Sequence, residues 1–346
     1  MSNSIGLLKT IAALSLLILL ASCSGSSSTP PAAPPDKAPP APTSDFKAAL
    51  VTPCPINDGG WGQNAYKGLK KIEGEMNAKV SNVVANSSQE FFDAARNYAA
   101  DGYSVVFGHA SEWYDPKLLE IAKANPNTIF IISGSENATP PNVSGIRFVL
   151  EDATYVLGFL AGSMTKSNVV GCVGPEKIPV IGSTFETFEA GVKAANPNAS
   201  VRIVWTENSK DVAKAKEMTL ALISEKADFI FQNANNGGLG VFDALKQSKG
   251  VYGFGSNDDQ SPSAPDAILA SAVLDVPGAF ISAAKKIKEQ KFEPKTLFLG
   301  MPDGSVGVAF NEKLKAQIPA DVLKKTEELI EKIKKGEVKV ERKSLK

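Results

Sequence analysis

Histidine and cysteine are scarce in this sequence. His109 is the single histidine among 346 residues, and there are three cysteines. A Ser-His-Asp or Cys-His arrangement would therefore have to use His109. No serine lies in a Gly-x-Ser-x-Gly elbow, and no His/Cys cluster has the spacing of a zinc site. We therefore expect neither an enzyme nor a metal site, and we expect no cofactor.

An excess of charge of either sign is also missing. Lysine and arginine total 37, aspartate and glutamate total 37, and the formal net charge is +0. A neutral chain whose lysines are spread out argues against a nucleic-acid partner. Hydrophobic residues make up 43% of the chain, which is ordinary for a folded protein. After the first 22 residues, no apolar run is long enough to span a membrane.

The N-terminus has the pattern of an export signal. Lys9 precedes a run at 11–21 that is apolar apart from Ser15, and this run is shorter than the ~20 residues that a membrane helix needs. The residues Leu-Ala-Ser-Cys at 20–23 resemble the bacterial lipoprotein signal. That resemblance implies cleavage after residue 22 and acylation of Cys23. An ordinary secretory signal with a chance cysteine is the alternative.

The segment that follows is predicted to be a tether. Residues 24–44 contain only Ser, Gly, Thr, Pro, Ala, Asp and Lys, and seven of these 21 residues are proline. Such a segment buries too little apolar surface to offset the entropy of ordering it. We expect 23–45 to be a lipidated, disordered linker. It would hold the protein on the extracytoplasmic side of a membrane, either the cell membrane or, in a Gram-negative cell, the periplasm or outer membrane.

Strand and helix patterns alternate along the rest of the chain, which predicts parallel sheets with helices on both faces. This alternation of strands and helices occurs in two successive runs. We predict strands at 47–52, 80–85, 104–108, 128–133, near 146, 169–173, 201–205, 229–232, 251–255, 268–273 and 297–300. We predict helices at about 65–76, 87–98, 115–124, 153–165, 185–195, 211–224, 240–247, 280–289 and 321–335.

Two such runs predict an α/β fold with two similar lobes. We assign 46–150 to an N-terminal lobe, completed by about 271–300, and 151–270 to a C-terminal lobe, completed by about 301–346. We expect a monomer. The two remaining cysteines, Cys54 and Cys172, fall in different lobes. An exported protein permits a disulfide between them, and two buried thiols are the alternative.

Ligands of open parallel sheets bind beyond the carboxyl ends of the strands, so the residues that follow each strand are the candidates for a binding site. They are rich in amide, carboxylate and aromatic groups. The candidate ligand-binding residues are Asp58, Trp61, Asn64, His109, Ser133, Asn233, Asn257 and Asp259.

Each of the main candidates also has a structural interpretation. Trp61 follows two glycines, where its indole would stack on a planar ligand or pack its loop onto the next helix. Asp58 would accept hydrogen bonds from ligand donors or cap that helix. His109 would line a cleft or serve as a hydrogen-bonded spacer.

Several stretches resemble the basic membrane protein family, which is the purine-nucleoside-receptor type of solute-binding lipoprotein. The stretches are NDGGWGQNAYKGL at 57–69, YVLGFLAG at 155–162, VVGCVG at 169–174, FEAGV at 188–192, GSNDDQ at 255–260 and ILASAV at 268–273. The resemblance implies a type I periplasmic-binding-protein fold, with two Rossmann-like lobes joined at a hinge by three crossovers. It also implies capture of a small molecule by hinge closure and its delivery to an ABC permease.

The resemblance also implies a ligand. Nucleoside-binding members use an Asp and an aromatic residue of the first loop for the base, and Asp58 and Trp61 match them. Members that hold ribose use an Asp and a Lys where this chain has Asn257 and Leu274. We therefore expect a purine-type ligand, either a base such as adenine or a nucleoside. The alternatives are a receptor for a flavin, sugar or signalling molecule that feeds a sensor, an exported enzyme acting on a purine or sugar, and a surface adhesin.

Overall fold

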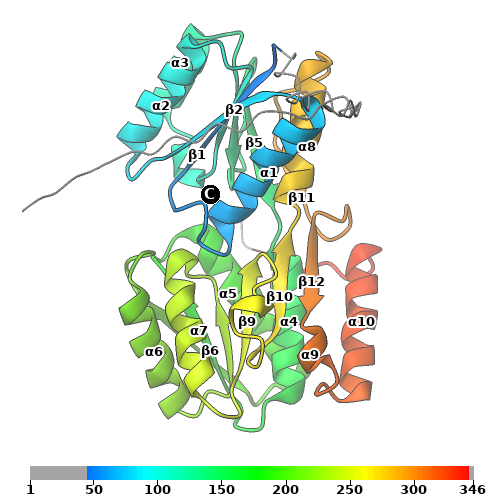
Figure 1. Ribbon diagram of the computed structural model, residues 1–346. Coiled ribbons are helices and arrows are strands. Elements are labelled where there is room, and N and C mark those ends of the chain that lie inside the picture. The colour runs from blue at the N-terminus through cyan, green and yellow to red at the C-terminus, as the bar shows by residue number, and fades with distance from the viewer. Residues whose placement is uncertain (1–44, 343–346) are drawn as a thin grey trace, which may run out of the picture. The chain divides into compact units, whose positions relative to one another are not determined.

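Two six-stranded sheets, each with helices on both faces, make up the part of the chain that the computed structural model describes, residues 45–342 (Figure 1). The predicted signal segment, the lipid attachment site Cys23 and the predicted linker up to residue 44 lie outside the described residues. The predicted α/β alternation is confirmed in both lobes.

All neighbouring strands of the first sheet are parallel, in the order β11-β5-β4-β3-β1-β2. Its strands are β1 (Lys47–Thr52), β2 (Lys79–Val84), β3 (Val105–Gly108), β4 (Ile129–Ser133), β5 (Val143–Phe148) and β11 (Leu297–Leu299). Its helices are α1 (Trp61–Met76), α2 (Ser88–Ala100), α3 (Pro116–Ala124) and α8 (Val276–Lys288). Helices α1 and α8 lie side by side, and α2 contacts α3 (Figure 1).

The second sheet has the order β12-β10-β9-β8-β6-β7, and only its edge strand β12 runs antiparallel to its neighbour. Its strands are β6 (Val169–Gly174), β7 (Ser200–Trp205), β8 (Phe229–Gln232), β9 (Tyr252–Asn257), β10 (Ile268–Leu274) and β12 (Val306–Phe310). Its helices are α4 (Glu151–Met164), α5 (Pro179–Ala195), α6 (Val212–Ser224), α7 (Gly238–Gln247), α9 (Glu312–Lys315) and α10 (Ala320–Lys334).

Local sequence explains where these elements begin and end. Strand β1 is buried from its second residue onward, as expected for a strand covered on both faces. Ser87 caps α2, since its side chain accepts a hydrogen bond from the backbone N–H of Glu90. Gly102, with φ +72°, lies just past the end of that helix, where a left-handed residue is favoured.

The chain passes between the two sheets three times. It leaves the first sheet after β5, returns at Asp275 once β10 has ended, and leaves again after β11. The first and third passages are tied together, because Val149 N–H donates to the Leu299 carbonyl (2.7 Å) and Met301 N–H donates to the Asp152 carboxylate (2.9 Å). These passages bring the carboxyl ends of both sets of parallel strands to one cleft.

The two cysteines of the described residues are buried free thiols. No disulfide joins Cys54 to Cys172, so the structure favours the alternative of two buried thiols. Burial raises the pKa of both thiols, with the Asp58 carboxylate as a second cause for Cys54. Among the helices of residues 45–342, none is both long and apolar enough to cross a membrane.

Candidate functional site

The loop after β1 is held by the Asp58 carboxylate. Oδ1 accepts hydrogen bonds from the backbone N–H groups of Gly60 (2.9 Å) and Gln63 (3.0 Å), and Oδ2 accepts one from Gly62 (2.9 Å). The side chain is only 3% exposed. Gly62 is required here, since a Cβ at that position would lie 2.6 Å from the Pro55 carbonyl oxygen. This tight turn makes Trp61 the first residue of α1.

The Trp61 indole stacks on the imidazole of His109, with ring centroids 3.6 Å apart and planes 20° from parallel. Two reciprocal hydrogen bonds fix the pair. Indole Nε1 donates to the His109 carbonyl (2.9 Å), and His109 Nε2 lies 3.1 Å from the Trp61 carbonyl. A carbonyl only accepts, so Nε2 carries the imidazole proton. One indole face is therefore covered by a fixed ring.

His109 is a buried, neutral residue whose ring supports one face of the Trp61 indole. Its side chain is completely buried, and its ring packs against that of Phe280 in a T-shaped arrangement, with the planes at 90°. Burial lowers the pKa of His109 to about 3, against a smaller raising effect of the hydrogen bond to Trp61. Its Nδ1 atom is buried without a hydrogen-bond partner. The imidazole thus stays uncharged at neutral pH.

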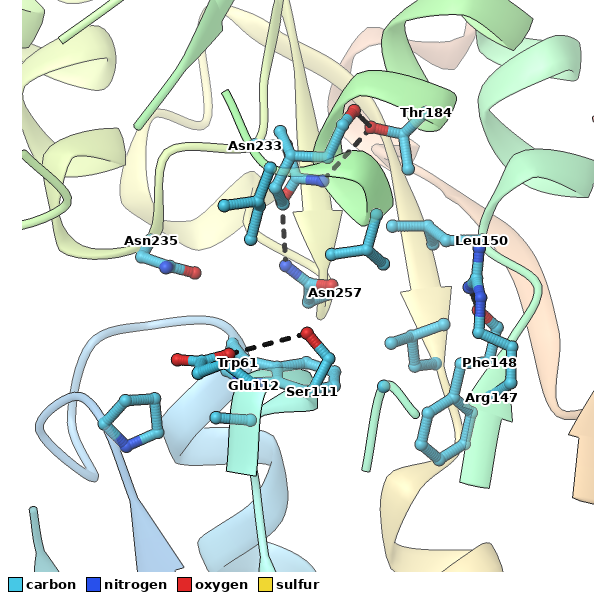
Figure 2. A pocket seen from close by; sticks show the side chains of 17 residues that line it. Trp61, Ser111, Glu112, Arg147, Phe148, Leu150, Thr184, Asn233, Asn235 and Asn257 are labelled. Carbon is cyan, nitrogen blue, oxygen red and sulfur yellow. Dashed lines mark hydrogen bonds between the residues drawn. The ribbon is translucent and has the colours of Figure 1, made fainter. Parts of the chain in front are cut away.

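The other indole face borders a cavity between the lobes. Figure 2 shows Trp61, Ser111 and Glu112 on one side, with Thr184, Asn233, Asn235 and Asn257 opposite and Arg147 and Phe148 beside them. Nearly all of these residues lie at or just beyond the carboxyl ends of strands, as the strand-end rule predicts. Among residues 45–342, the cavity is lined by Pro53, Trp61, Ala110, Ser111, Glu112, Gly134, Arg147, Phe148, Leu150, Ile178, Val180, Ile181, Thr184, Asn233, Asn235, Asn257 and Leu274.

Side-chain amides make up much of the polar surface opposite Trp61. Asn257 Nδ2 donates to Asn233 Oδ1 (3.3 Å), and Asn233 Nδ2 donates to Thr184 Oγ1 (3.3 Å). Asn235 is half-buried beside them. Amide groups offer donors and acceptors together, so this wall suits the edge of a heterocyclic ring. Between the amides and the hinge, the lining is aliphatic, with Leu150 and Leu274 among its members.

Two charged side chains, Glu112 and Arg147, line the cavity, and the charge of Arg147 is neutralised within the wall. Arg147 on β5 is 3% exposed and pairs with the completely buried carboxylate of Glu151. A second carboxylate, Glu136, lies 3.4 Å from Arg147 Nε. Glu151 also accepts a hydrogen bond from the Ser183 hydroxyl. The guanidinium is thus bound within the protein.

The cavity continues outward into a larger hollow. The two share Ser111, Glu112 and Asn235 among other residues. The outer hollow adds the carboxylates Glu136 and Glu176, and it adds Lys210, which donates to Asn86 Oδ1 of the other lobe (2.8 Å). The outer part of the cleft is therefore polar, while the inner part is mostly apolar.

The sequence-predicted site residues fall into three groups. Trp61, Asn233 and Asn257 line the inner cavity. Asp58, Asn64, His109 and Ser133 are buried nearby and are absent from its lining. Asp259 is exposed, and its carboxylate accepts a hydrogen bond from the Ser261 N–H (3.0 Å).

Sequence reasoning missed Arg147, Thr184 and the aliphatic residues at the start of α5. For Arg147 the sequence did hold a signal, because this arginine is the single charged residue of its strand, Val143–Phe148. Thr184 and the aliphatic residues gave none, because the predicted helix began at residue 185 and the structure begins α5 at Pro179. Among residues 45–342, no three His, Cys, Asp or Glu side chains come together as a group that could hold a metal ion.

The chain is similar to a family of transport proteins and to several bacterial proteins. A family model, Bmp, described as ABC transporter substrate-binding protein PnrA-like, matches residues 46–344. The chain is 30% identical over 320 residues to the CD4+ T-cell-stimulating antigen of Listeria monocytogenes, across 86% of this chain and 88% of that protein. It is 25% identical over 296 residues to a purine-binding protein of Brucella abortus, across 85% and 82%. It is 28% identical over 275 residues to the ABC transporter nucleoside-binding protein BmpA of Lactococcus lactis, across 73% and 78%.

The fold is also found in solved structures. A solute-binding protein of an ABC transporter system from Aeropyrum pernix K1 matches with a TM-score of 0.76 over 85% of this chain and 92% of that chain, at 18% identity. A likeness at that identity concerns the fold alone. It confirms the predicted type I periplasmic-binding-protein fold.

Proposed function

Because this chain belongs to the family of PnrA-like ABC transporter substrate-binding proteins, we propose that it captures a purine-type ligand in its interlobe cleft. Membership confirms the family resemblance seen in the sequence, and it implies a small-molecule ligand and a permease partner. Two relatives are named for purine or nucleoside binding. They support the proposal at modest identity.

The observation that carries the proposal is the indole face of Trp61. His109 holds the ring from behind through stacking and two hydrogen bonds, so the other face is a flat, ordered surface toward the cavity. Stacking of a base on an aromatic ring contributes ~1–3 kcal/mol and needs only a flat π-system. The amides of Asn233, Asn235 and Asn257 would then reach donors and acceptors on the ring edge.

Within this class, the lining favours a free base such as adenine over a nucleoside. A ribose presents hydroxyl groups that lose affinity when they are buried without partners. The aliphatic side chains of Leu150 and Leu274 offer none, and the guanidinium of Arg147 in the cavity wall is bound to Glu151. The family resemblance implies a carboxylate in nucleoside-binding members at the position where this chain has the Asn257 amide.

Calorimetric titration with adenine, guanine, adenosine and riboflavin tests the ligand class. We expect adenine to bind more tightly than adenosine. Trp61→Ala should weaken the affinity for adenine about 5- to 150-fold, which is the loss of ~1–3 kcal/mol. Phe298→Ala is the matched control, because this exposed aromatic residue lies on β11, outside the cavity lining. Absence of binding to every purine would contradict the proposal, and an unchanged affinity of Trp61→Ala would contradict the stacking role.

We also propose that the protein is anchored by a lipid on Cys23, with the signal 1–22 removed. The sequence Leu-Ala-Ser-Cys at 20–23 supports this. Cells grown with labelled palmitate should label the wild-type protein, and the label should be absent from Cys23→Ala. Labelling of the variant would show that the lipid is attached elsewhere. An unlabelled wild-type protein found in the medium would favour an ordinary secretory signal.

A further inference from the structure

Asn64 connects the two lobes from a buried position. It lies on α1 of the first lobe, and its side chain is 3% exposed. Its Nδ2 donates to the backbone carbonyl of Asn257 (2.7 Å) and to that of Leu274 (2.8 Å), which end β9 and β10 of the second sheet. Both hydrogens of one amide are thus used to hold two strand ends of the other lobe.

The two strand ends are parts of the ligand cavity. Asn257 and Leu274 both contribute to its lining, whereas Asn64 does not. Asn257 also has φ +69°, a left-handed backbone conformation that non-glycine residues seldom adopt without support. In this conformation its side chain reaches Asn233 and continues the row of amides. A hydrogen bond to the Asn257 carbonyl therefore acts on the direction of an amide that faces the cavity.

We propose that Asn64 is a positioning residue for ligand binding: it holds the main chains of Asn257 and Leu274 and so keeps the closed cleft in its binding shape. This role rests on the proposed function, because it describes the same cleft. Loss of the Asn64 amide removes one buried donor from each of these two carbonyl groups. The closed complex then reopens more easily, although no atom in contact with the ligand has been removed.

A second interlobe contact provides a matched control. Lys67, three positions further along α1, pairs with the carboxylate of Asp258, which is next to Asn257. The Lys67 side chain is 49% exposed, so this ion pair is screened by solvent. Lys67→Ala removes an ion pair between the same two lobes without removing a donor to the backbone of a cavity residue.

The test compares Asn64→Leu, which is similar in size and has no donor, with Lys67→Ala and the wild-type protein. Stopped-flow measurements with adenine should show dissociation from Asn64→Leu roughly tenfold faster, because one or more buried hydrogen bonds are lost. Association should remain close to that of the wild-type protein. Lys67→Ala should match the wild-type protein within about twofold. If Asn64→Leu does not fold, Asn64→Ala takes its place, since it also lacks the donor and adds no bulk at this buried position.

Hydrogen–deuterium exchange without ligand tests the same role independently. Peptides covering 252–260 and 268–276 should exchange faster in Asn64→Leu than in the wild-type protein, while peptides covering 200–224 should be unchanged. Unchanged exchange in the first two segments would overturn the proposal. So would equal effects of Asn64→Leu and Lys67→Ala, or a slower association that accounts for the loss of affinity. If the wild-type protein binds no purine, the proposed ligand is wrong, and exchange still decides the role of Asn64.

Discussion

Asp58 separates two interpretations of the first loop, and they predict opposite results for one substitution. The sequence suggested that its carboxylate recognises ligand donors or caps α1. In the structure, both oxygens are occupied by three backbone N–H groups of the loop and helix. Asp58→Asn keeps an acceptor at one oxygen position and places an NH₂ group against a backbone N–H at the other. Asp58→Ala removes the acceptor of all three hydrogen bonds.

We expect the loss in the free energy of unfolding to grow with the number of these hydrogen bonds that a substitution removes. Hydrogen bonds to a charged group contribute ~1.5–3 kcal/mol each, but they are not additive, and loss of a helix cap costs ~0.5–2 kcal/mol. Asp58→Ala should therefore destabilise the protein by about 2–4 kcal/mol, and Asp58→Asn by about 1–3 kcal/mol. These values are a large part of an ordinary stability of ~5–15 kcal/mol.

Urea titrations followed by circular dichroism measure the destabilisation, and calorimetry on the same samples gives the order of preference among purines. That order should be unchanged, because Asp58 is absent from the cavity lining. Asp259→Asn is the control, since this exposed carboxylate accepts a hydrogen bond from one neighbouring N–H and should change stability by less than ~0.5 kcal/mol. The reasoning is refuted if Asp58→Asn is as stable as the wild-type protein and loses adenine selectively.

Three further predictions concern the stacked pair and the thiols. Trp61→Phe keeps a ring but loses the Nε1 hydrogen bond, so calorimetry should give a smaller loss of adenine affinity than Trp61→Ala; equal losses would argue against stacking. Burial lowers the pKa of His109 to about 3 from 6.5, so the unfolded chain binds the extra proton between these values. The contribution of His109 to the free energy of unfolding should therefore fall by about 1.4 kcal/mol per pH unit as the pH drops from 6.5 to about 3. In urea titrations, the free energy of unfolding of His109→Gln should fall less steeply over the same pH range. Because burial raises the pKa of Cys54 and Cys172, a thiol reagent should label them only after denaturation, and fast labelling of the native protein would contradict their burial.

The fold was largely predictable because alternating buried strands and amphipathic helices leave a strong local pattern. Strand β1 was predicted with its observed bounds. Strand β12 was missed, because its sequence Val-Gly-Val-Ala-Phe is short and only half-buried. It forms an antiparallel edge, so its place depends on the third passage between the sheets and on its pairing with β10. Local propensity carries little information about such a long-range pairing.

The candidate site was only partly predictable, because position along the chain does not decide which way a polar side chain points. Asn233 and Asn257 follow strands and line the cavity, as the strand-end rule suggests. Asp58 obeys the same rule, but the tight turn around Gly62 directs its carboxylate to the backbone. Arg147 is the second-last residue of β5, and it was missed because only the residues that follow each strand were taken as candidates. Tertiary packing decides these orientations.

Charge in the cleft gives a last constraint on the ligand. A buried ion must be neutralised or bound by hydrogen bonds, and the Arg147 guanidinium is already paired with Glu151 and close to Glu136. Toward the mouth, Glu112 adds a further carboxylate, and Lys210 is bound to an amide of the other lobe. A phosphate would meet carboxylates there, and the described lining of the inner cavity offers it no guanidinium that lacks an ion-pair partner. The arrangement therefore favours an uncharged ring over a nucleotide, and AMP should bind more weakly than adenine in the calorimetric series.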